Sequence, residues 1–206
     1  METLSAILTY GGVAVFAATG AIAAANRKHT IVEFIFFATI TGIGGGTLRD
    51  LLLGVPVFWM HENSYLAVCA GVAVATWLLG TRVWHFRTLL WLDAIGLAAF
   101  SVIGSAKALG LGVPPLVAIV MGVMTGTFGG IIRDVLCAEV PLMLRKEIYA
   151  TAAAAGALGY IALVLSGVAP IWAQLAGFGT AFTIRAVGIA FGVSLPVYKP
   201  RPGRNY

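Results

Sequence analysis

Seven long apolar runs make up most of the sequence, and they limit the possible folds more than any other feature. An α-helix needs about 20 mostly apolar residues to cross the hydrocarbon core of a bilayer. Only 10% of the residues are charged, against roughly 25% in soluble domains. The sequence therefore predicts an all-α membrane protein with seven transmembrane helices. These helices are expected at residues 4–25, 30–54, 63–81, 88–109, 113–137, 147–167 and 170–194.

Transmembrane strands do not fit these runs, because such strands alternate in polarity over about ten residues and the runs are apolar on all sides. The first run ends in alanines that resemble a signal-peptide cleavage site, but no basic segment precedes it. We therefore expect residues 4–25 to remain in the protein as a spanning helix.

Two stretches of the sequence are near copies of each other, TGIGGGTLRD at residues 41–50 and TGTFGGIIRD at residues 125–134. The offset between them is 84 residues (125 minus 41), and it aligns further residues on both sides. These pairs include Leu8 and Leu92, Gly12 and Gly96, Phe16 and Phe100, Gly20 and Gly104, and Tyr65 and Tyr149. The chain therefore contains a repeat, with copies at residues 4–81 and 88–167, while residues 170–194 have no counterpart.

Each copy of the repeat is expected to hold three spanning helices. Because three is an odd number, the second copy enters the membrane from the face opposite to the first. The copies are then related by a pseudo-twofold axis in the membrane plane, as in transporters whose pathway runs along the repeat interface. The single domain is therefore an inverted repeat of two three-helix units, against which a seventh helix packs.

The basic residues indicate how the chain is oriented. One side of the predicted bundle has only Lys107, whereas the other side has most of the positive charge. The residues on this second side are Arg27, Lys28, Arg82, Arg87, Arg145, Lys146, Lys199, Arg201 and Arg204. By the positive-inside rule the N-terminus lies outside and the C-terminus in the cytoplasm. The charge bias suits a bacterial inner membrane and gives no reason to expect a nucleic-acid partner.

Glycines at the centre of a helix need an explanation, since each costs roughly 0.5 to 1 kcal/mol relative to alanine. One explanation is close packing of helices through small residues. The other is a kink or break whose freed carbonyls face a water-filled path, and the charges one turn later favour it. The candidate pore or gate glycines are Gly44, Gly45, Gly46, Gly129 and Gly130.

Charged side chains at membrane depth normally face a bundle interior or water. The repeat places Arg49 and Asp50 toward the outer face and Arg133 and Asp134 toward the inner face, as two equivalent constrictions of one pathway. Adjacent residues point about 100° apart on a helix, so each arginine and its neighbouring aspartate need not pair and can engage different helices.

Five further charges lie in or near the predicted spans and are possible pore or gating charges: Asp93, Lys107, Lys146, Glu147 and Arg185. Asp93 and Lys107 are close enough to helix ends for their side chains to reach the interface. Arg185 is about fifteen residues into the last span, so it is expected to find a carboxylate, carbonyl groups or water inside the bundle.

Enzymatic chemistry has little support in the sequence. A GxxxxGK[ST] phosphate loop is missing, and no histidine spacing suits a metal ligand set or a nucleophile with its base. Cys69 and Cys137 are isolated and are interpreted as packing residues. We predict no catalytic residue, no metal site and no cofactor.

The signatures GIGGGTLRD and GTFGGIIRD, with PLMLRKEIYA after the second, resemble the bacterial relatives of the trimeric intracellular cation channels, a family also named as a glycine transporter domain. The resemblance covers about residues 4–195. It implies a homotrimer in which each protomer has its own pore for monovalent cations such as potassium and sodium. It also implies that the second and fifth helices, bent at their glycines, frame and gate that pore.

The resemblance adds two details. Animal members have a Lys-Glu-Val element that helps to hold an inositol lipid, and Lys146, Glu147 and Ile148 are its nearest match here. Membrane lipid is thus an expected partner beside the other copies of the chain. Phe128 stands where the first motif has Gly44, which predicts a stiffer bend in the second motif.

Three functional classes stay open at this point. A cation channel needs a wet path with several weak oxygen ligands, here helix carbonyls, the motif aspartates and threonine hydroxyls. The candidate threonines are Thr41, Thr47, Thr125 and Thr127. A secondary transporter of a small amino acid such as glycine fits an inverted repeat with broken helices equally well on physical grounds. A structural membrane protein, in which the charges only hold helices together, is the third.

Overall fold

The computed structural model describes residues 2–80, 86–196 and 198, with side chains from residue 6 onward. Within these residues the chain forms seven α-helices and one short 3-10 helix, so the predicted all-helical fold is confirmed. The helices are α1 (Glu2–Asn26), α2 (Ile31–Leu52), α3 (Ser64–Leu79), α4 (Phe86–Gly110), α5 (Pro115–Leu136), η1 (Leu142–Leu144), α6 (Ala150–Leu165) and α7 (Pro170–Phe191).

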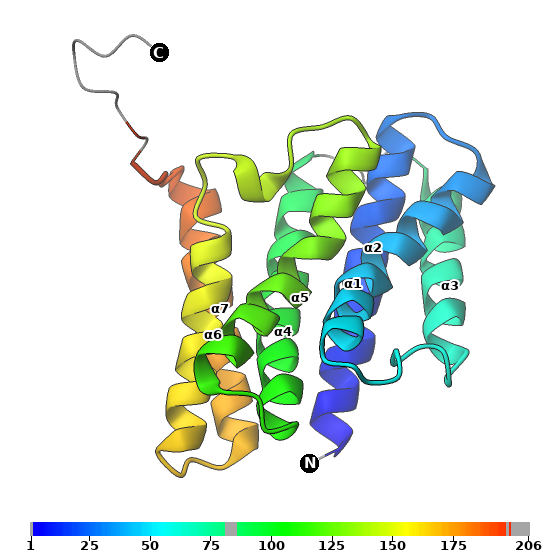
Figure 1. Cartoon of the computed structure of the whole chain (residues 1–206). Coiled ribbons are helices and arrows are strands. Elements are labelled where there is room, and N and C mark those ends of the chain that lie inside the picture. Colours follow the sequence, from blue (N-terminus) through cyan, green and yellow to red (C-terminus); the bar gives the residue numbers. More distant parts are fainter. Residues whose placement is uncertain (1, 81–85, 197, 199–206) are drawn as a thin grey trace, which may run out of the picture.

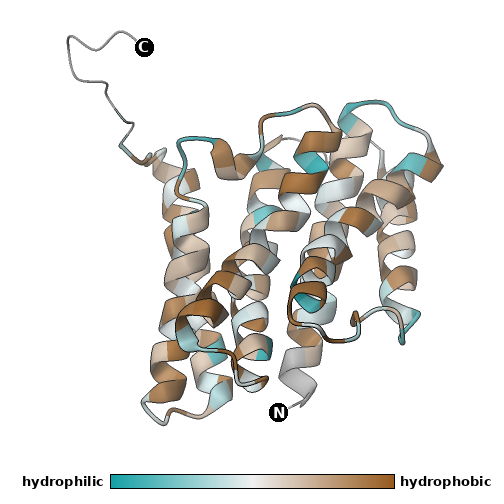
Figure 2. Ribbon diagram, viewed as in Figure 1, coloured by the Kyte–Doolittle hydropathy of each residue, from teal (hydrophilic) through white to brown (hydrophobic). Residues whose placement is uncertain are grey.

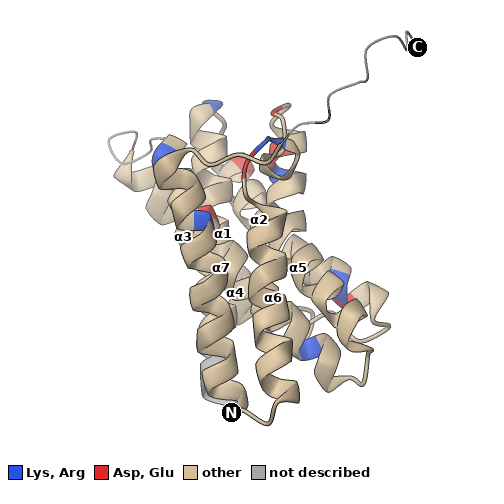
Figure 3. Cartoon of the chain, turned by 90° about the vertical axis from the view of Figure 1, so that its left-hand side faces the viewer, with Lys and Arg blue, Asp and Glu red and all other residues tan. Residues whose placement is uncertain are grey.

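Successive helices run in opposite directions, so α1 begins and α7 ends at opposite ends of the bundle (Figure 1). The same inversion relates α1 to α4, α2 to α5 and α3 to α6, as the repeat requires. Helix α7 has no partner in the repeat and packs on α4 and α6. We call the end with the α1–α2 and α5–α6 connections the basic face, because Arg27, Arg87, Arg145 and Lys146 lie there. Figure 3 shows most charged residues at this end and a few deeper in the bundle.

The third helix of each copy is shorter than the sequence predicts. Both α3 and α6 contain 16 residues, which is about 24 Å at 1.5 Å per residue. Five helices are long and apolar enough to span a membrane by length and composition. The expected start of the sixth span at residue 147 is wrong, because residues 145–149 form a non-helical connection in which Glu147 makes an isolated antiparallel bridge with Ser194. There the Leu195 amide donates to the Lys146 carbonyl at 2.9 Å.

Aromatic rings mark where the two copies of the repeat meet. The rings of Phe16 on α1 and Phe100 on α4, which are 84 positions apart, have centroids separated by 5.4 Å. A Cβ atom on Gly12 would be 2.9 Å from the Phe100 ring, and one on Gly96 would be 2.9 Å from the Phe16 ring. These reciprocal contacts place the pseudo-twofold axis between α1 and α4.

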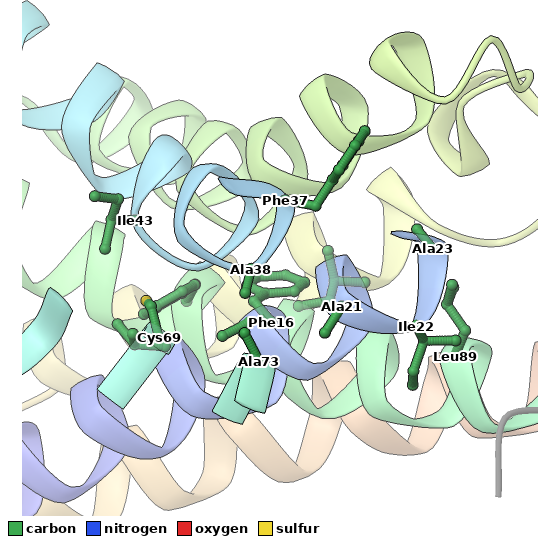
Figure 4. Packing of buried hydrophobic residues seen from close by; sticks show 14 of the residues in the cluster. Phe16, Ala21, Ile22, Ala23, Phe37, Ala38, Ile43, Cys69, Ala73 and Leu89 are labelled. Atoms are coloured by element: carbon green, nitrogen blue, oxygen red, sulfur yellow. The ribbon is translucent and has the colours of Figure 1, made fainter. Parts of the chain in front are cut away.

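Small and aromatic residues fill the space between α1, α2 and α3 (Figure 4). Phe16, Phe37, Cys69 and Ala73 are buried together there. Cys69 and Cys137 are both buried free thiols, as their interpretation as packing residues requires. Hydrophobic residues are spread along the helices (Figure 2). Many large apolar side chains are exposed, among them Val32, Leu78 and Leu116, as expected for helices surrounded by lipid.

Helices α2 and α5 are continuous through their glycine clusters, so neither helix is broken there, while a bend at the glycines stays a prediction. A Cβ atom on Gly45 would lie 2.2 Å from the carbonyl oxygen of Thr125, and one on Gly129 would lie 2.3 Å from that of Thr41. Real Cβ atoms do not approach so closely, so the backbones can touch only because both residues are glycine. Close packing, the alternative explanation, thus accounts for these two glycines.

The turn after each of these helices also repeats, with one difference. Gly54 follows α2 with φ of 66°, and Ala138 at the equivalent place after α5 has φ of 52°. A left-handed backbone costs a residue with a Cβ atom about 1 to 2 kcal/mol. Ala138→Gly is therefore expected to raise the free energy of unfolding by about 0.5 kcal/mol, and Gly54→Ala to lower it. Thermal unfolding of the purified variants measures both shifts, and a lower midpoint for Ala138→Gly would contradict this explanation.

Candidate functional site

The second motif places Arg133 in a fully buried ion-pair cluster. Its Nε atom donates to Asp134 Oδ1 at 2.8 Å, and its Nη1 atom donates to Asp93 Oδ1 at 2.9 Å. The same Nη1 atom donates to Thr19 Oγ1 at 2.8 Å. The other Asp134 oxygen, Oδ2, accepts from the Leu142 amide at 3.0 Å. The cluster thus joins α1, α4, α5 and the connection to α6.

The first motif builds the same geometry at the opposite face. Arg49 Nε donates to Asp50 Oδ1 at 2.8 Å, and Asp50 Oδ2 accepts from the Phe58 amide at 3.0 Å. Phe58 is 84 positions before Leu142, so both aspartates hold the connection that follows their helix in the same way. In this copy the extra charged partner is Lys107, whose Nζ atom lies 2.7 Å from Asp50 Oδ1.

The two clusters differ in net charge because each has one additional ionic residue. Position 23 is alanine where the other copy has Lys107, and position 9 is threonine where the other copy has Asp93. Two cations and one carboxylate therefore form the first cluster, whereas one cation and two carboxylates form the second. The repeat places two similar frameworks of opposite formal charge at opposite faces.

Each cluster borders a cavity. The larger one, about 600 Å³, lies on the side away from the basic face and is lined by residues that include Gly46, Arg49, Lys107, Phe58 and Thr9. We call it the outer cavity. The smaller one, about 120 Å³, lies at the basic face and is lined by residues that include Asp134, Arg27, Glu139 and Arg145. We call it the inner cavity.

The crossing of α2 and α5 at Gly45 and Gly129 is closely packed. At this crossing the Thr125 hydroxyl donates to the Met121 carbonyl at 2.6 Å. The Thr41 hydroxyl is buried and has no hydrogen-bond partner among the described residues. Thr47 and Thr127 each donate to a carbonyl one turn earlier at 2.8 Å. Each hydroxyl oxygen keeps lone pairs that can accept a hydrogen bond or coordinate a cation.

The other glycines of the motifs lie against side chains. A Cβ atom on Gly46 would be 2.6 Å from the Phe58 ring, and one on Gly130 would be 3.2 Å from the Tyr149 hydroxyl. A Cβ atom on Gly44 would be 3.3 Å from the end of the Ile132 side chain. Gly46 and Gly130 thus leave room for an aromatic residue beside each ion-pair cluster.

Arg185 finds the partners that its depth requires. It pairs with Glu147 at 2.8 Å and donates to the Ile148 carbonyl at 3.1 Å. Its guanidinium also lies 5.0 Å from the centre of the Tyr149 ring. Lys146 is exposed, and no described carboxylate pairs with it. Glu147 is thus held by its ion pair with Arg185 of α7, whereas Lys146 lies exposed at the basic face.

The sequence left open whether the motif charges pair. Each motif arginine pairs with its adjacent aspartate, because the long guanidinium side chain can fold back along the helix to reach it. One expectation from the sequence needs correction. Asp93 does not reach the interface, since its side chain is fully buried against Arg133. Thr19, which belongs to the second cluster, was not predicted from the sequence. The sequence does contain a signal for the extra charges of the clusters, because Asp93 and Lys107 have Thr9 and Ala23 as their counterparts in the other copy.

Comparison with known proteins supports the duplicated architecture. A protein-family model described as a glycine transporter matches the chain twice, over residues 6–81 and 90–165. A UPF0126 membrane protein of Vibrio cholerae is 42% identical over 192 residues, which are 91% of this chain and 80% of that protein. The UPF0126 inner membrane protein YadS of Escherichia coli K12 is 37% identical over 193 residues, 91% of this chain and 92% of YadS.

Solved structures of channel proteins are similar to this chain over nearly its whole length. The TRIC trimeric intracellular cation channel orthologue from Rhodobacter sphaeroides superposes with a TM-score of 0.90 at 46% identity, covering 93% of this chain and 100% of that one. A prokaryotic TRIC channel in 0.5 M KCl superposes with a TM-score of 0.87 at 28% identity, covering 95% of this chain and 100% of that one. The chain therefore belongs to the TRIC cation channel family.

Proposed function

We propose that this protein is a homotrimeric membrane channel for monovalent cations, with a separate pathway through each protomer. The observation that carries this proposal is its similarity to the Rhodobacter sphaeroides channel orthologue, at 46% identity over 93% of the chain. Potassium and sodium are the expected permeant ions. Membrane lipid and two further copies of the chain are the expected partners, and the channel needs no cofactor.

The pathway proposed for each protomer runs from the outer cavity past the α2–α5 crossing to the inner cavity. Arg49 and Lys107 border the outer cavity and Asp134 borders the inner one. For ions to pass, α2 and α5 must bend or move apart at Gly45 and Gly129. The charge clusters at the two ends then hold or release the connections that follow these helices.

The proposed orientation has the basic face in the cytoplasm, the N-terminus outside and the C-terminus inside a bacterial inner membrane. The described residues Arg27, Arg87, Arg145 and Lys146 at the basic face support this orientation. Arg82, Lys199, Arg201 and Arg204, which entered the same prediction, lie outside the described residues. The name of YadS as an inner membrane protein agrees with the location.

A transporter of glycine is the second candidate, because the family model that matches both halves is described as a glycine transporter. Purified protein in liposomes separates the two candidates. In a channel, the rate of potassium release down its gradient should not saturate at low millimolar potassium. In a transporter, the rate of uptake of labelled glycine should saturate with glycine concentration. Glycine uptake without potassium release would overturn the channel proposal.

Neutralising the motif carboxylates tests whether they border the pathway. Asp50→Asn and Asp134→Asn are each expected to change potassium conductance several-fold, since a unit charge near a narrow wet path changes the local ion concentration. Arg87→Gln, which removes a charge at the basic face outside both cavities, serves as control. Unchanged conductance and selectivity in both aspartate variants, with trimers intact, would remove these residues from the pathway.

A further inference from the structure

Arg49 has a hydrogen-bond donor that no described residue uses. Its side chain is 5% exposed, and its Nε and Nη2 atoms both lie 2.8 Å from Asp50 Oδ1. Its Nη1 atom makes no hydrogen bond to a described residue, yet it is not among the polar atoms sealed inside the protein. Because Arg49 lines the outer cavity, this donor opens on that cavity.

The second copy of the repeat shows which groups accept a hydrogen bond from such a donor. There the equivalent atom, Arg133 Nη1, binds Asp93 Oδ1 at 2.9 Å and Thr19 Oγ1 at 2.8 Å. The residues 84 positions away from Asp93 and Thr19 are Thr9 and Ile103, and both line the outer cavity. The first copy thus has the same arginine framework, but a neutral threonine beside the cavity takes the place of the carboxylate.

Positive charge in the outer cavity is incompletely balanced. Asp50 Oδ1 is shared by Arg49 and by Lys107, whose Nζ atom lies 2.7 Å away. Lys107 is one-third exposed and also lines the cavity, so part of its ammonium group remains available. Unbalanced charge at membrane depth is costly, and a second anion would stabilise this arrangement.

The size and walls of the outer cavity suit a small organic molecule. Its volume of about 600 Å³ falls in the range of ligand sites, roughly 300 to 1,000 Å³. Besides the two cations, its lining includes the rings of Phe58, Tyr65 and Tyr160. Such a lining combines charged hydrogen-bond donors with apolar walls, which favours an organic anion over a fully hydrated inorganic one.

We propose that the outer cavity binds a small organic carboxylate. The carboxylate group takes the place that the Asp93 side chain occupies in the second copy, and it accepts from Arg49 Nη1 and Lys107 Nζ. Charge-assisted hydrogen bonds of this kind are the strong ones. The inference concerns binding alone, so it stands or falls independently of whether the protein conducts cations.

Isothermal titration of the purified protein in detergent tests the site, with acetate and glycine as probes and sodium chloride as competitor. At least one carboxylate is expected to bind saturably, with a dissociation constant of about 1 mM or lower, and to resist an equal concentration of chloride. The absence of saturable binding of either probe overturns the proposal. Displacement by chloride at equal concentration also overturns it, because the site would then accept any anion.

Substitutions at position 9 supply a matched pair. Thr9→Asp should place a carboxylate beside Arg49, as Asp93 lies beside Arg133, and thereby abolish ligand binding. Thr9→Asn has nearly the same shape without the charge and should retain binding. Lys107→Ala, which copies Ala23 of the other half, should weaken binding about tenfold. Equal ligand affinity in Thr9→Asp and Thr9→Asn, both eluting as folded protein, contradicts the assignment.

Discussion

Gly129→Ala is expected to lower the free energy of unfolding by about 3 kcal/mol and to alter ion flux, since the α2–α5 crossing lies on the proposed pathway. The new Cβ atom would lie 2.3 Å from the Thr41 carbonyl oxygen, and Gly45→Ala would bring one 2.2 Å from that of Thr125. No rotation of a side chain relieves either contact, since both partners are backbone atoms. The two helices would have to separate at this close crossing. Thermal unfolding in detergent and potassium flux from liposomes measure the two effects.

Gly71→Ala is the matched control for these variants. A Cβ atom on Gly71 of α3 meets no atom within 4 Å, so the substitution should leave the midpoint unchanged or slightly raised. If Gly129→Ala unfolds at the same temperature as Gly71→Ala, the crossing is not closely packed at Gly129. Normal flux through a stable Gly129→Ala protein would show that the crossing is not part of the ion pathway.

Arg133→Met is expected to lower the free energy of unfolding by about 3 to 5 kcal/mol, because it leaves two carboxylates without their shared cation. Arg133 and Asp93 are both fully buried, and Asp134 is nearly so. Adding Asp93→Asn to this variant removes one of the unpaired charges. The double variant should therefore be more stable than Arg133→Met alone, although Asp93→Asn by itself destabilises the protein.

A double-mutant cycle on thermal or denaturant unfolding measures this coupling. The expected coupling energy between Arg133 and Asp93 is at least 1 kcal/mol, since their side chains are in direct contact. Independent effects that simply add would show that the buried pair does not contribute as a pair. Gel filtration of each variant checks that the assembly is retained.

The fold could be predicted from the sequence because its two strongest signals are global. Apolar runs of spanning length define the helices, and a constant offset of 84 residues between motifs that share G-G-x-x-R-D defines the inversion. Reciprocal contacts such as those between Phe16 and Gly96 and between Phe100 and Gly12 then follow from symmetry. Helix ends were less predictable, because hydropathy does not reveal the non-helical backbone at residues 145–149.

The ion-pair clusters contain motif residues that the sequence singled out, but the sequence did not predict which of them pair. Helical geometry separates Arg49 from Asp50 by about 100°, yet the flexible arginine side chain spans that angle. Glycine content did not distinguish an interrupted helix from a close crossing, since both need a missing Cβ atom. The opposite charge of the two clusters was readable in principle, because Lys107 and Asp93 have an alanine and a threonine as their counterparts.

Single-channel recording of the purified protein in a planar bilayer, with potassium chloride more concentrated on one side, tests the central claim most directly. The proposed pathway predicts stepwise currents whose reversal potential lies near the equilibrium potential of potassium. It also predicts that Gly45→Ala alters these currents while Gly71→Ala preserves them. A bilayer with no currents from correctly assembled protein, or a reversal potential near that of chloride, would contradict the account.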